Sequence, residues 1–158
     1  MTPLKTNAMR LLETAGYAYE HLEYEYDESD LSGVHAAEAM GQDPDTVFKT
    51  LVVKGERRGI LVFCIPVAAE LDLKKCAAIA GDKRLEMVHV KELLGLTGYI
   101  RGGCSPLGMK KKYPTYIDET AEIFDAICVS AGQRGHQIRL SPDDLKKITD
   151  ASFADLTK

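Results

Sequence analysis

The chain has 158 residues, of which 45% are hydrophobic and 28% are charged, and its formal net charge is -4. This length allows one well-buried core and favours a single domain over residues 1–158. The negative charge argues against a general nucleic-acid coat, because non-specific affinity for phosphate comes from excess lysine and arginine. A local basic site stays open, since short basic runs occur at residues 54–58 and 110–112.

The four cysteines indicate free thiols. Cys64, Cys76, Cys104 and Cys128 lie far apart, with no C-x-x-C pair and no neighbouring histidine to suggest a metal site. No leader precedes the first predicted helix, and no apolar run approaches the roughly 20 residues of a membrane span. We therefore expect a cytoplasmic protein that needs no cofactor and no metal.

The first predicted element is a helix over residues 4–15, where apolar side chains recur at helical spacing before Gly16. Alternating aromatic and charged residues over 17–26 favour a half-buried strand. Ser32 can cap a second helix that ends near Met40, and Asp43 with Pro44 begins a short one. Apolar runs over 47–53 and 59–67 flank a charged turn and predict a hairpin.

The second half alternates shorter elements. Asp72 precedes a helical segment that ends at Gly81, followed by a short strand over 85–88 and a short helix over 90–96. Strands are predicted over 113–117, 126–130 and 137–140, and Ser141 with Pro142 begins a last helix. Because strict alternation is lacking, we expect an α+β fold with one mixed, strongly curved, barrel-like sheet flanked by helices.

Lys49 is the most unusual residue of the predicted hairpin. Alternation along VFKTLVV puts Lys49 on one face of the strand and Thr50 on the other, and both faces are otherwise apolar. Burying an unpaired ammonium is very unfavourable, so Lys49 must reach the strand end, lose part of its charge or meet an anion. An exposed strand-end lysine and a ligand-binding lysine fit the spacing equally well.

Two glycine-rich loops could line a binding site. In residues 99–108, Gly102 and Gly103 allow close approach of a ligand and could aim backbone N–H groups at an anion or an oxyanion. In residues 130–137, Arg134 could contact phosphate. Taken alone, each loop is more often a plain turn.

No protein nucleophile is evident. Cys104 lies in the first glycine-rich loop, but no histidine is near it in sequence, and no Ser-His-Asp or Cys-His arrangement can be recognised. The histidines that could act as a base are His21, His35, His89 and His136.

Together these segments resemble the YbaK/EbsC family. The blocks VFKTLVV, TGYIRGGCSPLGMKKK and SAGQRG occur in that order, and the opening and the closing LSPDDL are also similar. The resemblance covers nearly the whole chain and implies a domain related to the editing insertion of bacterial prolyl-tRNA synthetases. It also implies deacylation of Cys-tRNA(Pro), a second sieve for an amino acid that a synthetase rejects only weakly. The implied partners are the 3′ end of aminoacylated tRNA and prolyl-tRNA synthetase.

The mechanism implied by the resemblance needs no protein nucleophile, because the substrate thiol attacks its own ester carbonyl and leaves as a cyclic thiolactone. The protein positions the reactants and stabilises the oxyanion. The implied catalytic residues are Lys49, Gly102 and Gly103. The implied substrate-binding residues are Tyr24, Thr50, Ser105, Pro106, Ser130, Gly132, Arg134 and Gln137.

Two departures leave the substrate open. The chain has Ser32-Gly33 where the Cys-tRNA(Pro) enzymes place a phenylalanine before a glycine, and Gln137 where some place an acid. One alternative is a deacylase for another small amino acid such as alanine, which would require an activated water. The other is a non-catalytic module that binds charged tRNA or a synthetase.

Overall fold

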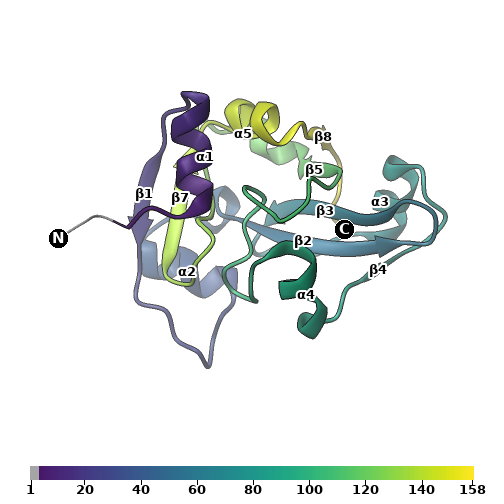
Figure 1. The fold of residues 1–158 in the computed structure, drawn as a ribbon, viewed down its shortest axis with the longest axis horizontal. Coiled ribbons are helices and arrows are strands. Elements are labelled where there is room, and N and C mark those ends of the chain that lie inside the picture. The colour runs from purple at the N-terminus through teal and green to yellow at the C-terminus, as the bar shows by residue number, and fades with distance from the viewer. Residues whose placement is uncertain (1–3) are drawn as a thin grey trace.

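The computed structural model describes residues 4–158, which form an α+β fold with two sheets (Figure 1). The larger sheet is mixed and has the order β4-β2-β3-β5-β8, and the smaller one is antiparallel with the order β1-β7-β6. The strands are β1 (Glu20–Glu23), β2 (Phe48–Gly55), β3 (Gly59–Pro66), β4 (Leu85–Met87), β5 (Thr115–Asp118), β6 (Ile127–Ser130), β7 (His136–Leu140) and β8 (Ser152–Ala154). The helices are α1 (Asn7–Ala15), α2 (Gly33–Met40), α3 (Leu73–Ala80), α4 (Val90–Thr97) and α5 (Pro142–Thr149), with 3-10 turns η1 (Pro44–Thr46) and η2 (Glu119–Ile123).

The predicted helices are confirmed, and local capping explains where they begin and end. The Ser32 hydroxyl accepts a hydrogen bond from the His35 N–H at the start of α2. The helix ends at Gly41, whose φ of 68° is left-handed. The predicted hairpin is also confirmed as β2 and β3, whereas η2 and β8 were not predicted.

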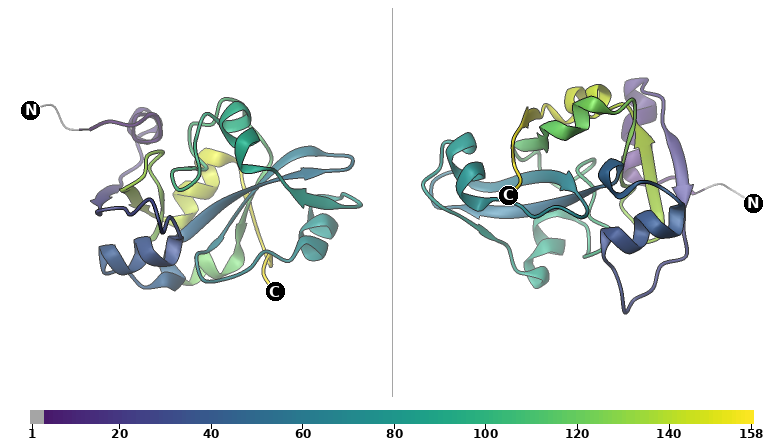
Figure 2. Two further views of the ribbon diagram at one scale, coloured as in Figure 1. Left: turned by 90° about the horizontal axis from the view of Figure 1, so that it is seen from below. Right: turned by 180° about the vertical axis from the view of Figure 1, so that it is seen from behind.

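The sheets and helices enclose three core clusters. The first joins α1 and α5 to the smaller sheet and to one face of the larger sheet, the second joins α3 to the larger sheet, and the third packs α2 near the start of β2 and against β6. Figures 1 and 2 show α1 and α2 at the end of the molecule that holds β1 and β7, and α3 near the turn of the β2-β3 hairpin at the opposite end. β2 and β3 contribute to both of the larger clusters and so connect the two ends of the molecule.

The predicted barrel-like sheet is wrong, because the strands form two open sheets. A single parallel bridge between Val47 and Cys128 joins them just before β2. The same edge of β2 then pairs with β4 only from Val53 to Gly55. Between that bridge and Val53, no strand of residues 4–158 pairs with this edge of β2, although β6 packs close to it. The edge of β2 from Phe48 to Val52 is therefore open.

All four cysteines are free, as predicted. Among the helices of residues 4–158, none combines the length and the apolar character of a membrane span.

Candidate active site

A hollow of about 410 Å³ lies against the open edge of β2. Its walls come from the start of α2, the segment from β4 into α4, the first glycine-rich loop and the β6-β7 pair. The polar or charged side chains among its lining residues include Tyr24, Lys49, Thr50, His89, Arg101, Ser130 and Gln137. The hollow therefore lies beside the unpaired edge of β2.

The backbone of Thr50 faces the hollow. On this edge the Val52 carbonyl accepts a hydrogen bond from the Val88 N–H at 3.2 Å, so Val52 directs its polar groups away from β3. Antiparallel residues alternate in this respect, and Thr50 lies two residues earlier in the same strand. Thr50 therefore presents one backbone donor and one acceptor at a fixed position beside the hollow.

Lys49 supplies a partly buried positive charge to the site, which the exposed Arg101 also lines. Its side chain is half-buried, and this burial lowers the pKa of the ammonium, while Glu70 acts in the opposite direction. Within residues 4–158 Lys49 forms no ion pair. A partly desolvated cation without a salt bridge favours an anionic or strongly polar ligand.

Gln137 carries an unmet hydrogen-bonding group. It faces Ser130 across the β6-β7 ladder, and both residues line the hollow. Gln137 is only 6% exposed, and its Oε1 has no hydrogen-bond partner among residues 4–158. Since a buried acceptor without a donor is costly, a ligand that donates to Gln137 would remove that penalty.

The two glycine-rich loops pack against each other at the rim. Gly102 has a φ of 85°, which favours glycine. A Cβ atom on Gly103 would lie 3.2 Å from the Arg134 backbone nitrogen, and the Arg134 Nε donates to the Arg101 carbonyl at 2.8 Å. Gly132 lies under the Tyr99 ring, where a Cβ atom would come within 2.9 Å of Cε1.

The structure brings together part of the predicted set. Tyr24, Lys49, Thr50, Gly102, Ser130 and Gln137 line the hollow, whereas Gly103, Gly132 and Arg134 hold its rim by contacts between the loops. Ser105 and Pro106 are not brought to the hollow. The Ser105 hydroxyl is buried and accepts a hydrogen bond from the Leu107 N–H, and Pro106 lies at a separate depression.

Sequence reasoning missed Leu31 and Leu93, which line the hollow, and named His89 only as one of four possible bases without placing it there. His89 precedes α4, and its side chain forms no capping hydrogen bond. No motif marks these residues: Leu31 lies shortly before α2, and Leu93 lies within α4. A different group, His21, Glu23 and His136, could hold a metal ion outside the hollow, although the sequence suggested no metal site.

Cys104 lines the hollow but is unsuited to be a nucleophile. Burial raises the pKa of its thiol to about 12, so the reactive thiolate is scarce at neutral pH. Burial likewise raises the pKa of Cys64 to about 12. The site therefore offers a cation, fixed backbone groups and an unmet acceptor, without an activated protein thiol.

Comparison with known proteins gives consistent matches. Residues 31–148 match the model of the aminoacyl-tRNA editing domain family. The chain is 48% identical over 156 residues, 99% of this chain and 95% of the other, to EbsC of Enterococcus faecalis, whose name gives it as a candidate Cys-tRNA(Pro)/Cys-tRNA(Cys) deacylase.

Two further matches extend this likeness. The chain is 32% identical over 115 residues to a proline–tRNA ligase of Shouchella clausii, covering 72% of this chain and 20% of the ligase. A crystal structure described as that of a candidate trans-editing enzyme for prolyl-tRNA synthetase superposes with a TM-score of 0.84 at 29% identity, covering 99% of each chain. The chain belongs to the aminoacyl-tRNA editing domain family.

Proposed function

We propose that this protein is an aminoacyl-tRNA deacylase that removes cysteine from mischarged tRNA(Pro) in the hollow beside β2. The observation that carries the proposal is the convergence of the half-buried Lys49, the Thr50 backbone and the unpartnered Gln137 Oε1 on one hollow. The names of EbsC and of the trans-editing relative support the same activity.

The size of the hollow suits a small aminoacyl group with part of its nucleoside. Its volume of about 410 Å³ lies within the usual range for small-molecule sites. Lys49 would bind a phosphate or ribose oxygen of the tRNA 3′ end, and Gln137 Oε1 would accept a hydrogen bond from the substrate ammonium. Because Gln137 is uncharged, it would hold the substrate ammonium by a directed hydrogen bond and not by an ion pair.

The reaction would be intramolecular in the substrate. The cysteinyl sulfur attacks the ester carbonyl carbon, the new C–S bond replaces the C–O bond, and the thiol proton ends on the released ribose hydroxyl. The Thr50 and Gly102 backbone N–H groups are the proposed oxyanion donors. Positioning and oxyanion stabilisation together account for a large rate increase without a protein nucleophile, in agreement with the raised pKa of Cys104.

Hydrolysis of a panel of charged tRNAs tests this proposal. We expect rapid release from Cys-tRNA(Pro) with a thiolactone as the first product, and no release from S-methylcysteinyl-tRNA(Pro), whose sulfur cannot give up a proton. Equal rates for Ala-tRNA(Pro) would overturn the thiol-assisted mechanism in favour of an activated water. Tight binding of charged tRNA with no release from any substrate would favour the non-catalytic module.

We further propose that the chain acts as one domain in the cytoplasm and meets its substrate on prolyl-tRNA synthetase. The net charge of -4 disfavours strong independent binding to tRNA, and the match to a proline–tRNA ligase fits this association. Addition of the synthetase should then lower the KM for Cys-tRNA(Pro) and leave kcat unchanged. An unchanged KM would contradict the proposed partner and leave the deacylase proposal intact.

A further inference from the structure

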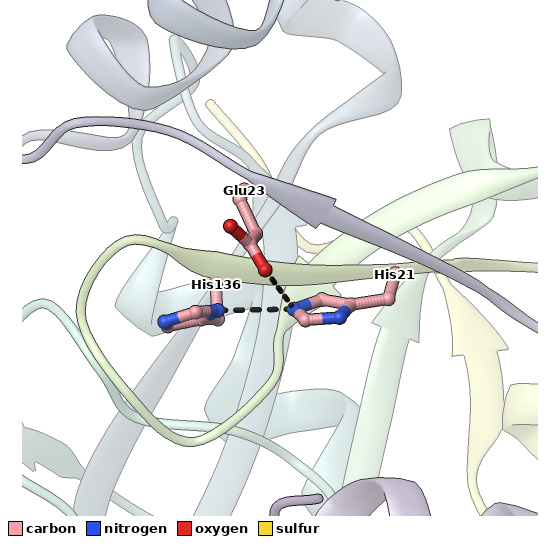
Figure 3. Close-up of side chains that lie close together, drawn as sticks. All are labelled: His21, Glu23 and His136. Carbon is pink, nitrogen blue, oxygen red and sulfur yellow. Dashed lines mark hydrogen bonds and ion pairs between the residues drawn. The ribbon is translucent and has the colours of Figure 1, made fainter. Parts of the chain in front are cut away.

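Two histidines and a glutamate converge on the smaller sheet (Figure 3). His21 Nε2 lies 3.0 Å from His136 Nδ1 and 3.8 Å from a carboxylate oxygen of Glu23. The potential ligand atoms of the three residues all lie within 4.8 Å of one another. Figure 3 shows the two imidazole rings meeting edge to edge, with the Glu23 carboxylate directed at the same point.

The strand register produces this convergence. Glu23 of β1 is directly opposite His136 of β7, and His21 lies two residues before Glu23 on the same face. His136 alternates with Gln137, so the cluster and the hollow occupy opposite faces of the β1-β7 pair. None of the three residues lines the hollow.

The chemistry of the set suits a transition metal. Two imidazole nitrogens and one carboxylate are a common ligand set for Zn²⁺, with one position left for water. Zn–N bonds of about 2.0–2.1 Å in a tetrahedral site place the two nitrogens roughly 3.3 Å apart, close to the 3.0 Å observed here.

We propose that His21, Glu23 and His136 form a binding site for one divalent transition-metal ion of the Zn²⁺ type. The ion joins β1 to β7 next to Tyr24 and Gln137, which follow Glu23 and His136 in the chain and line the hollow. Occupancy of the site therefore stabilises the register that holds one wall of the hollow.

Titration of untagged, chelator-treated protein with Zn²⁺ alone tests the site. Isothermal titration calorimetry should give one ion per chain with a micromolar or tighter dissociation constant. Co²⁺ should give visible absorption bands typical of tetrahedral coordination. Saturating Zn²⁺ should also raise the melting temperature, because the ion binds the folded register.

Variants decide which residues hold the ion. Losing a residue that only hydrogen-bonds to a metal ligand weakens metal binding about 10- to 100-fold. Losing a ligand itself costs more, so His21→Gln and His136→Gln should each weaken binding by at least roughly 100-fold. Glu23→Gln should weaken it less, because the carboxylate is 68% exposed. The matched controls are His35→Gln and Glu20→Gln, which should leave binding unchanged.

Absence of Zn²⁺ binding by the wild-type protein at micromolar concentrations would overturn the proposal and leave a simple imidazole–imidazole hydrogen bond. Unchanged affinity in both histidine variants would overturn it too. If His136→Gln fails to fold, His21→Gln and the exposed Glu23→Gln still decide the assignment. Each measurement is independent of tRNA hydrolysis.

Discussion

Two hollows lie along β2, one at each end of the strand, and they differ in how their polar groups are satisfied. The near hollow, beside the open edge of β2, contains the half-buried Lys49 and the Gln137 Oε1 that has no hydrogen-bond donor among residues 4–158. The far hollow, beside the turn between β2 and β3, is larger at about 880 Å³ and is lined by charges of both signs. These are Lys54, Glu56, Lys74, Lys83, Arg84 and Glu86.

The difference teaches that size does not identify the reactive site. In the far hollow the basic side chains are exposed to solvent beside carboxylates of the same surface, so little is gained when a ligand arrives. In the near hollow Lys49 is half-buried without a salt bridge, and Gln137 Oε1 is buried without a hydrogen-bond donor, among residues 4–158. The desolvation of Lys49 and of Gln137 Oε1, rather than volume or total charge, therefore favours the near hollow as the binding site.

The largest expected effect comes from removing one of two lysines on β2, Lys49 in the near hollow, and comparing it with removal of the other, Lys54 in the far hollow. Lys49→Ala should lower kcat/KM for Cys-tRNA(Pro) by roughly 100- to 1000-fold, the usual loss when one stabilising group of a reactive site is removed. Lys54→Ala removes an exposed charge from the far hollow and should have little effect. Equal losses in the two variants would erase the distinction between the hollows.

Glycines with left-handed backbones occur near both hollows and give a second comparison. Gly102→Ala and Gly81→Ala each force an alanine into a positive φ, of 85° and 71°, and each should destabilise the fold by about 1–2 kcal/mol in denaturant melts. Only Gly102→Ala should also reduce deacylation, because it changes the rim of the near hollow. Loss of activity in Gly81→Ala at a temperature where it is folded would contradict this assignment.

Gln137→Leu should separate stability from activity. Replacing an unsatisfied buried acceptor by an apolar side chain of similar size should raise the melting temperature. Removing the proposed contact to the substrate should lower kcat/KM about 10-fold, as expected for one hydrogen bond. The control, Glu86→Leu in the far hollow, should not change kcat/KM. A destabilised Gln137→Leu variant with full activity would be the opposite of what we expect.

The smallest effect is expected at Cys104. Its thiol has a pKa raised to about 12 and is no nucleophile in the proposed reaction, so Cys104→Ala should keep the wild-type kcat. Iodoacetamide should likewise leave the folded protein active. Complete inactivation by either change, without unfolding, would require a role for this thiol.

Much of the fold could be predicted from local signals. Capping residues such as Ser32 and left-handed glycines such as Gly41 fix the helix boundaries, and the charged turn between two apolar runs fixes the hairpin. β8 was missed because three residues, Ser152–Ala154, form a strand only by pairing with β5. The barrel prediction was wrong because sheet closure depends on which edges meet, and no local pattern encodes that.

The candidate site shows the same limit. Lys49 is visible in the sequence because an ammonium is unusual in an apolar strand. Ser105 and Pro106 lie in the same loop as Gly102, yet the loop folds them away from the hollow. His89 enters the hollow from a segment without a motif, since its position depends on the contact between β4 and the edge of β2.

Nuclear magnetic resonance with a non-hydrolysable, amide-linked cysteinyl-adenosine tests the central claim most directly. Titration should shift the backbone amide signals of Thr50, Gly102 and Gln137 together and leave those of Lys83 and Arg84 in the far hollow unchanged. Saturable shifts confined to Lys83 and Arg84 would contradict the claim that the open edge of β2 receives the aminoacyl end of tRNA.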